Sequence, residues 1–515
     1  MHAEGDGVAV GWRHLDIDLL HGVCDALASR LACPRALKAA RRVSRHWEAA
    51  VNAHLTHLCP PSEVDARGLR ALPGKFGSVT GLRLRDVTDE GLAALGVFPG
   101  LKALRLEYCR RVTEGGIGAL GRLTTLADLR LLDFRAYTRR SSRAACAIQT
   151  GPQVLSRLVG LAHLDVELCW PFADGGLLCL TALTRLSFLR LLGCDAVTVE
   201  GLASLARLSR LESLELGAGL HGRCGGITNA SAQVLTALRG LRHIGLVGCA
   251  IDGGLQCAAE WPNLTSVDLS DCPAVRGVGI RGLSAIPALR EVRLRRTLKA
   301  HLLSDDDLTP ITSLTSLTLL DLADARKLSN RSMATVGGLT SLRHLALQGC
   351  NNVDDLGVEC LTTLQGLQYL DIGMVWAISD RGMRHVGSLQ GLTFLRASGL
   401  LGVGDPGFRH LLQLKSLRYL AVNACPRMSN VGLQYIGGIT SLTLLDLACC
   451  TSLTNSGLEH LAGLSSLMEL NLAACQGIDS AGVQQLQTLV GNEDLLVMGP
   501  SLLSYLGRSG SFPFR

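Results

Sequence analysis

The chain has 515 residues, of which 47% are apolar and only 4% aromatic, and its formal net charge at pH 7 is +6. So small a charge for this length argues against a general nucleic-acid-binding protein, which carries concentrated basic faces. No uninterrupted apolar run is long enough to span a bilayer, and the first residues do not read as a signal peptide. Neither nucleic acid nor a membrane is therefore expected as a partner.

The N-terminal region has a different pattern from the rest of the chain. Residues 1–12 are expected to be disordered, and residues 13–55 are expected to form a small helical unit. Its first helix is predicted from apolar residues at steps of three and four: Ile17, Leu20, Val23 and Leu27. A second apolar run follows Pro34 and consists of Leu37, Ala40, Val43, Trp47 and Ala50. A unit of this size is too short to be stable alone. Residues 56–78 are interpreted as a linker and N-terminal cap.

Residues 79–491 repeat one pattern. Seven copies that open L-x-x-L-x-(apolar) are spaced 25 residues apart, at Leu317, Leu342, Leu367, Leu392, Leu417, Leu442 and Leu467. Nine earlier copies open at wider spacing, at Val79, Leu101, Leu126, Leu161, Leu186, Leu211, Leu241, Leu264 and Leu289. A period in this range with this phasing is the leucine-rich-repeat pattern, in which each copy gives a strand and a helix. It predicts an α/β solenoid of about sixteen repeats, with a parallel concave sheet and convex helices. Residues 492–515 would be a C-terminal cap and tail.

The copy that starts at Leu342 shows what each position does. Leu345 and Leu347 alternate along the predicted strand, so both side chains point into the coil. Cys350 sits where the chain leaves the strand, and its small thiol is expected to fill an inner corner beside the next copy. Asp354 or Asp355 can cap the helix that follows. Burying one Leu contributes roughly 1.5–3 kcal/mol, so stacking of copies is strongly favoured.

The cysteine pattern favours free thiols. Half of the 18 cysteines occupy the same repeat position: Cys109, Cys169, Cys194, Cys249, Cys272, Cys350, Cys425, Cys450 and Cys475. The others show neither a C-x-x-C pair nor Cys/His zinc spacing, so no metal site is expected. Reduced, buried thiols favour an intracellular protein, in the cytoplasm, the nucleus or both.

Two G-x-G-x-x-G matches, at 277–282 and 402–407, could suggest a dinucleotide site. Each contains the glycine that nearly every copy places before its helix, Gly279 and Gly407, and a solenoid sheet lacks the crevice that such a site needs. We interpret both as repeat glycines. No P-loop, H-E-x-x-H or G-x-S-x-G motif is found, so neither a cofactor nor catalytic residues are expected. Three longer copies carry insertions, at 135–150, 217–226 and 295–310, which are interpreted mainly as solvated rim loops, the alternative being partner contact or phosphorylation.

Outward strand positions give two candidate binding surfaces. Arg83, Arg105 and Arg130 occupy one position in the first three copies. They form either a solvated basic face, which we favour, or a site for an anionic ligand or acidic peptide. The second surface is a row formed by His344, Tyr369, Phe394, Tyr419 and Leu444. Its three central aromatic residues are either a stacking ladder or a target-binding patch, with Asp371 and Arg396 as a charged rim. As part of such a patch, Phe394 is expected to be an exposed ring that contributes little to the core.

The N-terminal segment resembles an F-box. The stretches L-D-I-D-L-L-H-G-V and L-K-A-A-R-R-V-S-R-H-W-E-A-A-V are similar to that family's two helices, the second of which ends in V-x-(R/K)-x-W. Asp16 stands where the family usually has Pro, and the spacer from Ala28 to Arg35 is longer than usual. The repeats resemble the cysteine-containing leucine-rich repeats that commonly follow an F-box.

The two resemblances together imply a substrate receptor of an SCF-type ubiquitin ligase, which is itself not an enzyme. It would bind a Skp-type adaptor, and a cullin through that adaptor, and it would hold a target protein for proteasomal degradation. The adaptor-binding residues implied are Leu15, Ile17, Leu20, Val23, Leu37, Val43 and Trp47. Trp47 could equally be a core residue of the small helical unit. The alternative is an intracellular leucine-rich-repeat interaction scaffold without a ligase role.

Overall fold

The computed structural model describes residues 55–60, 64–133, 151–167, 173–193, 197–217, 224–251, 253–286, 288–295, 303–492 and 495–499. The expected disordered segment 1–12 and the expected F-box-like unit lie outside the described residues, except for residue 55. All seven predicted adaptor-binding residues, Cys169 and Cys194 therefore also lie outside them.

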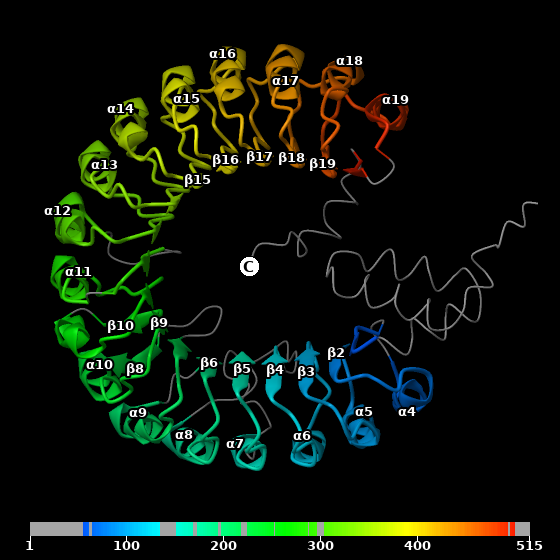
Figure 1. Cartoon of the computed structure of the whole chain (residues 1–515), viewed down its shortest axis with the longest axis vertical. Coiled ribbons are helices and arrows are strands. Elements are labelled where there is room, and N and C mark those ends of the chain that lie inside the picture. Colours follow the sequence, from blue (N-terminus) through cyan, green and yellow to red (C-terminus); the bar gives the residue numbers. More distant parts are fainter. Residues whose placement is uncertain are drawn as a thin grey trace, which may run out of the picture. The chain divides into compact units, whose positions relative to one another are not determined.

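The chain divides into two compact units, Met1–Gly222 and Arg223–Arg515. Each unit by itself is a solenoid, with a parallel sheet along its inner side and helices along its outer side (Figure 1). The predicted leucine-rich-repeat architecture is thus confirmed for each unit.

In the first unit each strand pairs in parallel with the next one along the chain. Its strands are β1 (His57–Leu58), β2 (Gly81–Arg85), β3 (Ala103–Glu107), β4 (Asp128–Leu132), β5 (His163–Glu167), β6 (Phe188–Leu192) and β7 (Ser213–Gly217). Its helices are α4 (Ala66–Lys75), α5 (Asp89–Ala94), α6 (Glu114–Leu120), α7 (Gly151–Leu155), α8 (Asp174–Leu180) and α9 (Val199–Ser204), with short 3₁₀ turns η2 (Leu95–Val97) and η3 (Leu205–Arg207). The short strand β1 and helix α4 precede the first predicted copy and continue the same alternation.

The second unit opens with a small two-stranded pair, β8 (Cys224–Thr228) and β10 (Cys249–Ala250). Its main sheet contains β9 (His243–Val247), β11 (Ser266–Asp268), β12 (Glu291–Arg293), β13 (Leu319–Asp321), β14 (His344–Ala346), β15 (Tyr369–Asp371), β16 (Phe394–Arg396), β17 (Tyr419–Ala421), β18 (Leu444–Asp446), β19 (Glu469–Asn471) and β20 (Leu496–Met498). Its helices are α10 (Asn229–Leu235), α11 (Gly277–Leu283), α12 (Asp305–Leu308), α13 (Asn330–Gly337), α14 (Asp355–Cys360), α15 (Asp380–Gly387), α16 (Asp405–Arg409), α17 (Asn430–Gly437), α18 (Asn455–Leu458) and α19 (Ser480–Val490). The 3₁₀ segments are η4 (Gly253–Glu260), η5 (Thr309–Ser313), η6 (Leu361–Thr363), η7 (His410–Gln413) and η8 (Glu459–Leu461).

Each of the sixteen predicted starts is followed two residues later by a strand, from β2 to β19. Within the regular copies the register advances by 25 residues, as in the pairing of Leu345 with Leu370 and of Leu370 with Leu395. These inward leucines are fully buried and form a column through successive copies. The leucine period therefore sets the strand register, because a one-residue slip would turn every inward side chain outward.

A second repeated contact links the helix starts. The carboxylate of Asp405, at the start of α16, accepts hydrogen bonds from the Ser429 amide at 2.9 Å and hydroxyl at 2.6 Å, and from the Gly432 amide at 2.9 Å. A Cβ on Gly432 would lie 2.5 Å from the same carboxylate oxygen. A Cβ on Gly407 would likewise lie 2.6 Å from the carboxylate of Asp380. The helix glycine makes room for the acid of the preceding copy, which accounts for Gly407 in its G-x-G-x-x-G match.

The two aspartates of the copy at Leu342 have different roles. Asp354 is the N-cap of α14, and its side chain accepts a hydrogen bond from the Leu356 amide. Asp355 instead bonds the amide and hydroxyl of Ser379 in the next copy.

The acidic end of the insertion at 295–310 is not a loop, contrary to expectation. Asp305, Asp306 and Asp307 form the first turn of α12, where acidic side chains are favourable. Asp307 forms a capping box with Ser304.

The cysteines predicted at the inner corner are buried wherever the structure describes them. The thiol of Cys350 donates to the carbonyl of Leu322 at 3.2 Å, and Cys425 repeats the contact with Ala397 at 3.4 Å. Burial raises the pKa of Cys350 to about 12 and that of Cys425 to about 11. Both side chains are thus neutral thiols that join adjacent copies.

Candidate functional site

Two groups of side chains on the inner face of the sheets form the candidate sites. The aromatic ladder, in the second unit, consists of His344, Tyr369, Phe394 and Tyr419. The arginine cluster, in the first unit, consists of Arg83, Arg85 and Arg105 around Glu107. Each group combines outward positions of adjacent strands.

The aromatic ladder is a continuous stack because its residues are register partners on β14 to β17. The ring centroids are 3.6 Å apart between His344 and Tyr369, 4.2 Å between Tyr369 and Phe394, and 3.9 Å between Phe394 and Tyr419. The interplanar angles are 14° or less. Leu444, the next register partner, packs against the cluster. The structure thus brings together the three aromatic residues expected to stand side by side.

The ladder is more buried than the sequence suggested. Phe394 and Tyr419 are each only 8% exposed, so the expectation that Phe394 is an exposed ring was wrong. The cause is the stacking itself, because both faces of the Phe394 ring are covered by neighbouring rings. A partner would therefore meet ring edges and tyrosine hydroxyls. The arrangement does not resemble an aromatic cage, which needs open ring faces around a cation.

The two charged residues expected at the rim form one ion pair. Arg396 lies 3.3 Å from the carboxylate of Asp371, which also accepts from the Gly373 amide at 2.9 Å. Asp371 is only 3% exposed, and burial raises its pKa, while Arg396 and the Gly373 amide favour its charged form. Burial also raises the pKa of Tyr369 to about 12, so this phenol stays protonated and can donate a hydrogen bond. The pair is a part-buried polar centre next to the ladder.

A groove runs beside the ladder and was not anticipated. It has a volume of about 510 Å³. Its lining consists of Arg343, His344, Gln368, Tyr369, Thr393, Phe394, Arg418, Tyr419, Thr443 and Leu444. Arg343 and Arg418 are exposed, so basic side chains accompany the aromatic wall.

The same copies also carry an exposed apolar rim where the chain leaves the strands. Trp376 and Leu401 occupy equivalent positions 25 residues apart and are 51% and 52% exposed. Met374 is 44% exposed, and a Cβ on Gly399 would lie 2.5 Å from its sulfur. Neighbouring exposed apolar side chains of this size commonly mark binding surfaces. We call Met374, Trp376 and Leu401 the apolar rim.

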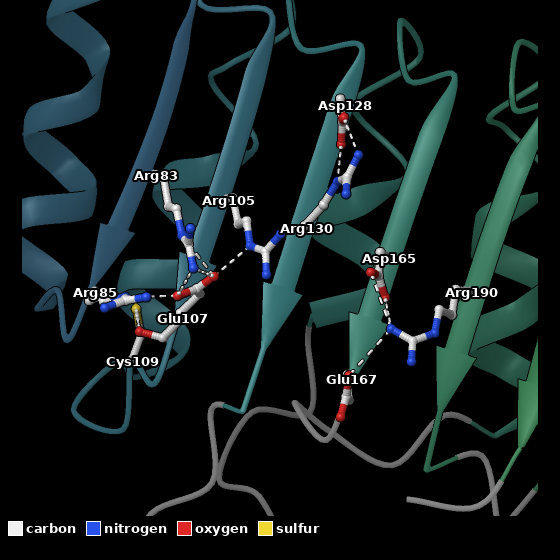
Figure 2. A network of polar contacts seen from close by, with 10 residues as sticks. All are labelled: Arg83, Arg85, Arg105, Glu107, Cys109, Asp128, Arg130, Asp165, Glu167 and Arg190. Atoms are coloured by element: carbon white, nitrogen blue, oxygen red, sulfur yellow. Dashed lines mark hydrogen bonds and ion pairs between the residues drawn. The ribbon is translucent and has the colours of Figure 1, made fainter. Parts of the chain in front are cut away.

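The arginine cluster is organised by one buried carboxylate (Figure 2). Arg83 donates to both oxygens of Glu107 at 3.0 Å, from Nε and from Nη2. The Nε atoms of Arg85 and Arg105 donate to the same carboxylate at 2.9 and 2.5 Å. Although burial would raise the pKa of Glu107, the hydrogen bonds from Arg83 and Arg85 lower it below its ordinary value. Glu107 is therefore ionised and only 3% exposed.

Arg130 does not join this cluster, although it shares the outward position of Arg83 and Arg105. It pairs with Asp128 on its own strand, through Nε at 3.2 Å and Nη2 at 3.1 Å. Figure 2 also shows one arginine that is shared by two acids, since Arg190 contacts Asp165 at 3.4 Å and Glu167 at 3.3 Å. The predicted row of three arginines is thus divided into a cluster on Glu107 and a separate ion pair.

The described ranges contain neither a cluster suited to a metal ion nor a membrane-spanning helix. No group of three or more His, Cys, Asp or Glu side chains in this part of the chain could hold a metal ion. No helix in the same residues is long and apolar enough to cross a bilayer.

Comparisons with known proteins concern the repeats. The family model described as Leucine Rich repeat matches residues 338–361 and 438–462. No curated protein matches the sequence. An internalin of Listeria monocytogenes is 20% identical over 79% of this chain and 93% of its own, with a TM-score of 0.38. A leucine-rich-repeat protein of Leptospira interrogans is 16% identical over 87% of this chain and 96% of its own, with a TM-score of 0.42. The yeast Rad7 and Elc1 complex gives 13% identity over 95% of this chain and 98% of that chain, with a TM-score of 0.45.

The matched repeats lie within the regular copies, whose strands, buried leucine columns and outer helices have the leucine-rich-repeat arrangement. The chain therefore contains leucine-rich repeats, and each of its two units folds as a leucine-rich-repeat solenoid.

Proposed function

We propose that the chain is the target-recognition subunit of an SCF-type ubiquitin ligase. In this proposal residues 13–55 bind a Skp-type adaptor, and a cullin through it, while the repeats hold a target protein. The observation that carries the proposal is the order of the two sequence patterns, an F-box-like stretch with V-S-R-H-W followed by cysteine-containing leucine-rich repeats. The chain forms no covalent bond in this role, since it acts by holding the target near the transfer machinery. The cytoplasm, the nucleus or both would be its location.

The target surface in this proposal lies on the copies that start at Leu367, Leu392 and Leu417. These copies supply Tyr369, Phe394 and Tyr419 of the aromatic ladder, the Asp371–Arg396 pair and the apolar rim. Aromatic side chains, Met and Arg are enriched in protein interfaces, whose apolar centre is commonly surrounded by polar groups. The largest exposed side chain on it is the indole of Trp376, which is 51% exposed. We therefore assign the main anchoring role to Trp376 and a supporting role to the ladder edge.

Adaptor binding is tested with the purified full chain and a purified Skp-type adaptor. Replacing Trp47 with Ala should abolish or strongly weaken the complex, because this residue closes the F-box-like motif. The matched control is Trp376→Ala, a change of the same residue type in the repeats, which should leave adaptor affinity unchanged. Equal adaptor affinity for wild type and Trp47→Ala would favour the alternative, a leucine-rich-repeat interaction scaffold with no ligase role.

Target binding is tested separately on the repeats. Trp376→Ala should weaken target affinity by at least about tenfold, as expected for an aromatic anchor at an interface. Trp376 is half exposed, so the melting temperature should change little. Unchanged affinity would remove the apolar rim from the proposed surface.

A further inference from the structure

The arginine cluster carries more positive charge than its own carboxylate can neutralise. Three guanidinium groups surround the single carboxylate of Glu107, which leaves a net charge of about +2. The neighbouring Arg130 contributes no excess charge, because it is paired with Asp128. The three arginine side chains are 38–46% exposed, so their charge faces the solvent beside the inner surface of the sheet.

The cluster also has guanidinium N–H donors that do not bond to Glu107. Arg85 and Arg105 each contact Glu107 through Nε, and Arg83 uses Nε and one terminal nitrogen. A guanidinium group has five N–H donors in a planar fork. Bonding to Glu107 on the Nε side fixes each fork in place and leaves terminal N–H groups directed elsewhere. Glu107 therefore holds the three guanidinium groups in place, while some of their terminal N–H groups do not bond to it.

A hollow lies next to these donors, in the first unit. It measures about 300 Å³, and its wall includes Arg83, Arg105, His57 and the paired Arg130 and Asp128. Its floor is formed partly by Gly81 and Ala103, which hold the first outward position of β2 and β3.

Later copies fill the same position with large rings. On β5 and β6 it is occupied by His163 and Phe188, which stack with their centroids 4.0 Å apart. In the first copies the small residues Gly81 and Ala103 lie in this row between His57 on β1 and Asp128 on β4, which leaves the hollow open.

We infer that the arginine cluster and this hollow form a binding site for a phosphoryl group. A phosphate ester carries about −1.5 to −2 charges at pH 7 and three acceptor oxygens, which matches the excess charge and the spare donors. Arginine forks are well suited to bidentate phosphate recognition. The group could belong to a phosphorylated side chain of a protein or to a small phosphorylated molecule, and the chemistry of recognition is the same for both.

A purely structural role explains less of the geometry. One arginine already satisfies Glu107, because Arg83 alone contacts both carboxylate oxygens at 3.0 Å. Adding Arg85 and Arg105 brings like charges together, which opposes folding unless an anion is present. A site for an anion accounts for all three arginines and for the hollow. This inference does not depend on whether residues 13–55 bind an adaptor.

The site is tested by calorimetric titration of the full chain. The probes are inorganic phosphate, a phosphoserine peptide and the same peptide without phosphate. Phosphate and the phosphopeptide should bind the wild type, and the unphosphorylated peptide should bind at least about tenfold more weakly, a difference of about 1.4 kcal/mol. Tighter binding of the phosphopeptide than of phosphate would identify a protein as the source. Binding of phosphate alone would identify a small phosphorylated molecule.

Variants localise the site. Arg83→Gln and Arg105→Gln should each weaken phosphate binding by about tenfold, the effect of losing one charge-assisted contact. Arg190→Gln is the matched control, because Arg190 occupies the same outward position on β6, is already paired with Asp165 and Glu167, and does not line the hollow. It should change the affinity by less than about threefold. Melting curves of each variant verify folding, and a second pair, Arg83→Lys and Arg105→Lys, keeps the charge but removes the fork.

Partial retention of phosphate binding in the lysine variants supports the site. The inference is overturned if millimolar phosphate does not bind the wild type, or if folded Arg83→Gln and Arg105→Gln bind it normally. It is also overturned if Arg190→Gln loses as much affinity as they do.

Discussion

The contact between Gly432 in α17 and the Asp405 carboxylate of the preceding copy predicts that Gly432→Ala lowers stability, whereas helix propensity predicts that it raises stability. Alanine is favoured over glycine in a helix by about 1 kcal/mol, so propensity alone predicts that Gly432→Ala stabilises α17. The structure predicts the opposite, because the new Cβ would lie 2.5 Å from the Asp405 carboxylate and 3.0 Å from Met428. Displacing the carboxylate would weaken up to three hydrogen bonds, each contributing about 1.5–3 kcal/mol at most. Some relaxation will recover part of this, so we expect a net loss of about 1–3 kcal/mol.

The assay combines chemical unfolding with hydrogen exchange, since a repeat array need not unfold in one step. Faster exchange is expected over residues 405–437, which include the amides that donate to Asp405. The matched control is Gly118→Ala in α6, where a Cβ would meet nothing within 4 Å. That variant should be stabilised by about 0.5–1 kcal/mol.

A double variant isolates the clash. Adding Asp405→Ala to Gly432→Ala should cost at least about 1 kcal/mol less than the sum of the two single changes. A stabilised Gly432→Ala, or strict additivity in this cycle, would refute the explanation of the glycine.

Three further predictions follow from burial. Phe394→Ala should lower the free energy of unfolding by about 2–4 kcal/mol. Phe394→Leu keeps apolar volume but loses two ring stacks, so it should lower this free energy by about 1–3 kcal/mol. Chemical unfolding measures both changes, and an unchanged stability of Phe394→Ala would contradict the role of the stack. Burial lowers the pKa of His344 to about 4, so the unfolded chain binds more protons and stability should fall as the pH drops from 6.5 toward 4. In urea unfolding, wild type should lose about 1–2 kcal/mol more than His344→Phe between pH 7 and pH 5, and equal losses would argue against a neutral buried ring. In the native chain, a thiol reagent should label the exposed Cys449 rapidly and Cys350 only on unfolding, as followed by mass spectrometry. Equal labelling rates for the two cysteines would contradict the burial of Cys350.

The sequence alone was sufficient for the strand positions and the inner core. Leucines at fixed steps are the main source of buried area, so the start of each strand could be predicted even in copies with wider spacing, such as the one at Leu241. The buried role of Cys350 was predictable for the same reason, because its position recurs. The acids of 305–307 were misassigned because the wider spacing before Leu317 suggested a loop, whereas Asp305 supplies the next copy's contact with Ser329.

The candidate sites were less predictable, because they depend on contacts between rows of side chains. The outward arginine row was visible, but Glu107 lies two residues beyond Arg105, and only the sheet register shows that it bonds Arg83 and Arg85 across the strand. The row of aromatic residues was also visible, but its stacking and the burial of Phe394 follow from side-chain packing that spacing does not encode. Trp376 and Leu401 could have been found by comparing equivalent positions outside the strand.

The measurement that tests the central claim most directly is a three-component binding experiment on the full chain. A tagged Skp-type adaptor serves as bait, and the amounts of the chain and of its protein target are quantified by mass spectrometry. The account predicts that wild type brings the target to the adaptor, that Trp376→Ala stays on the adaptor but loses the target, and that deletion of residues 1–55 removes both. Retention of the chain on the adaptor after that deletion, or of the target by Trp376→Ala, would contradict the account.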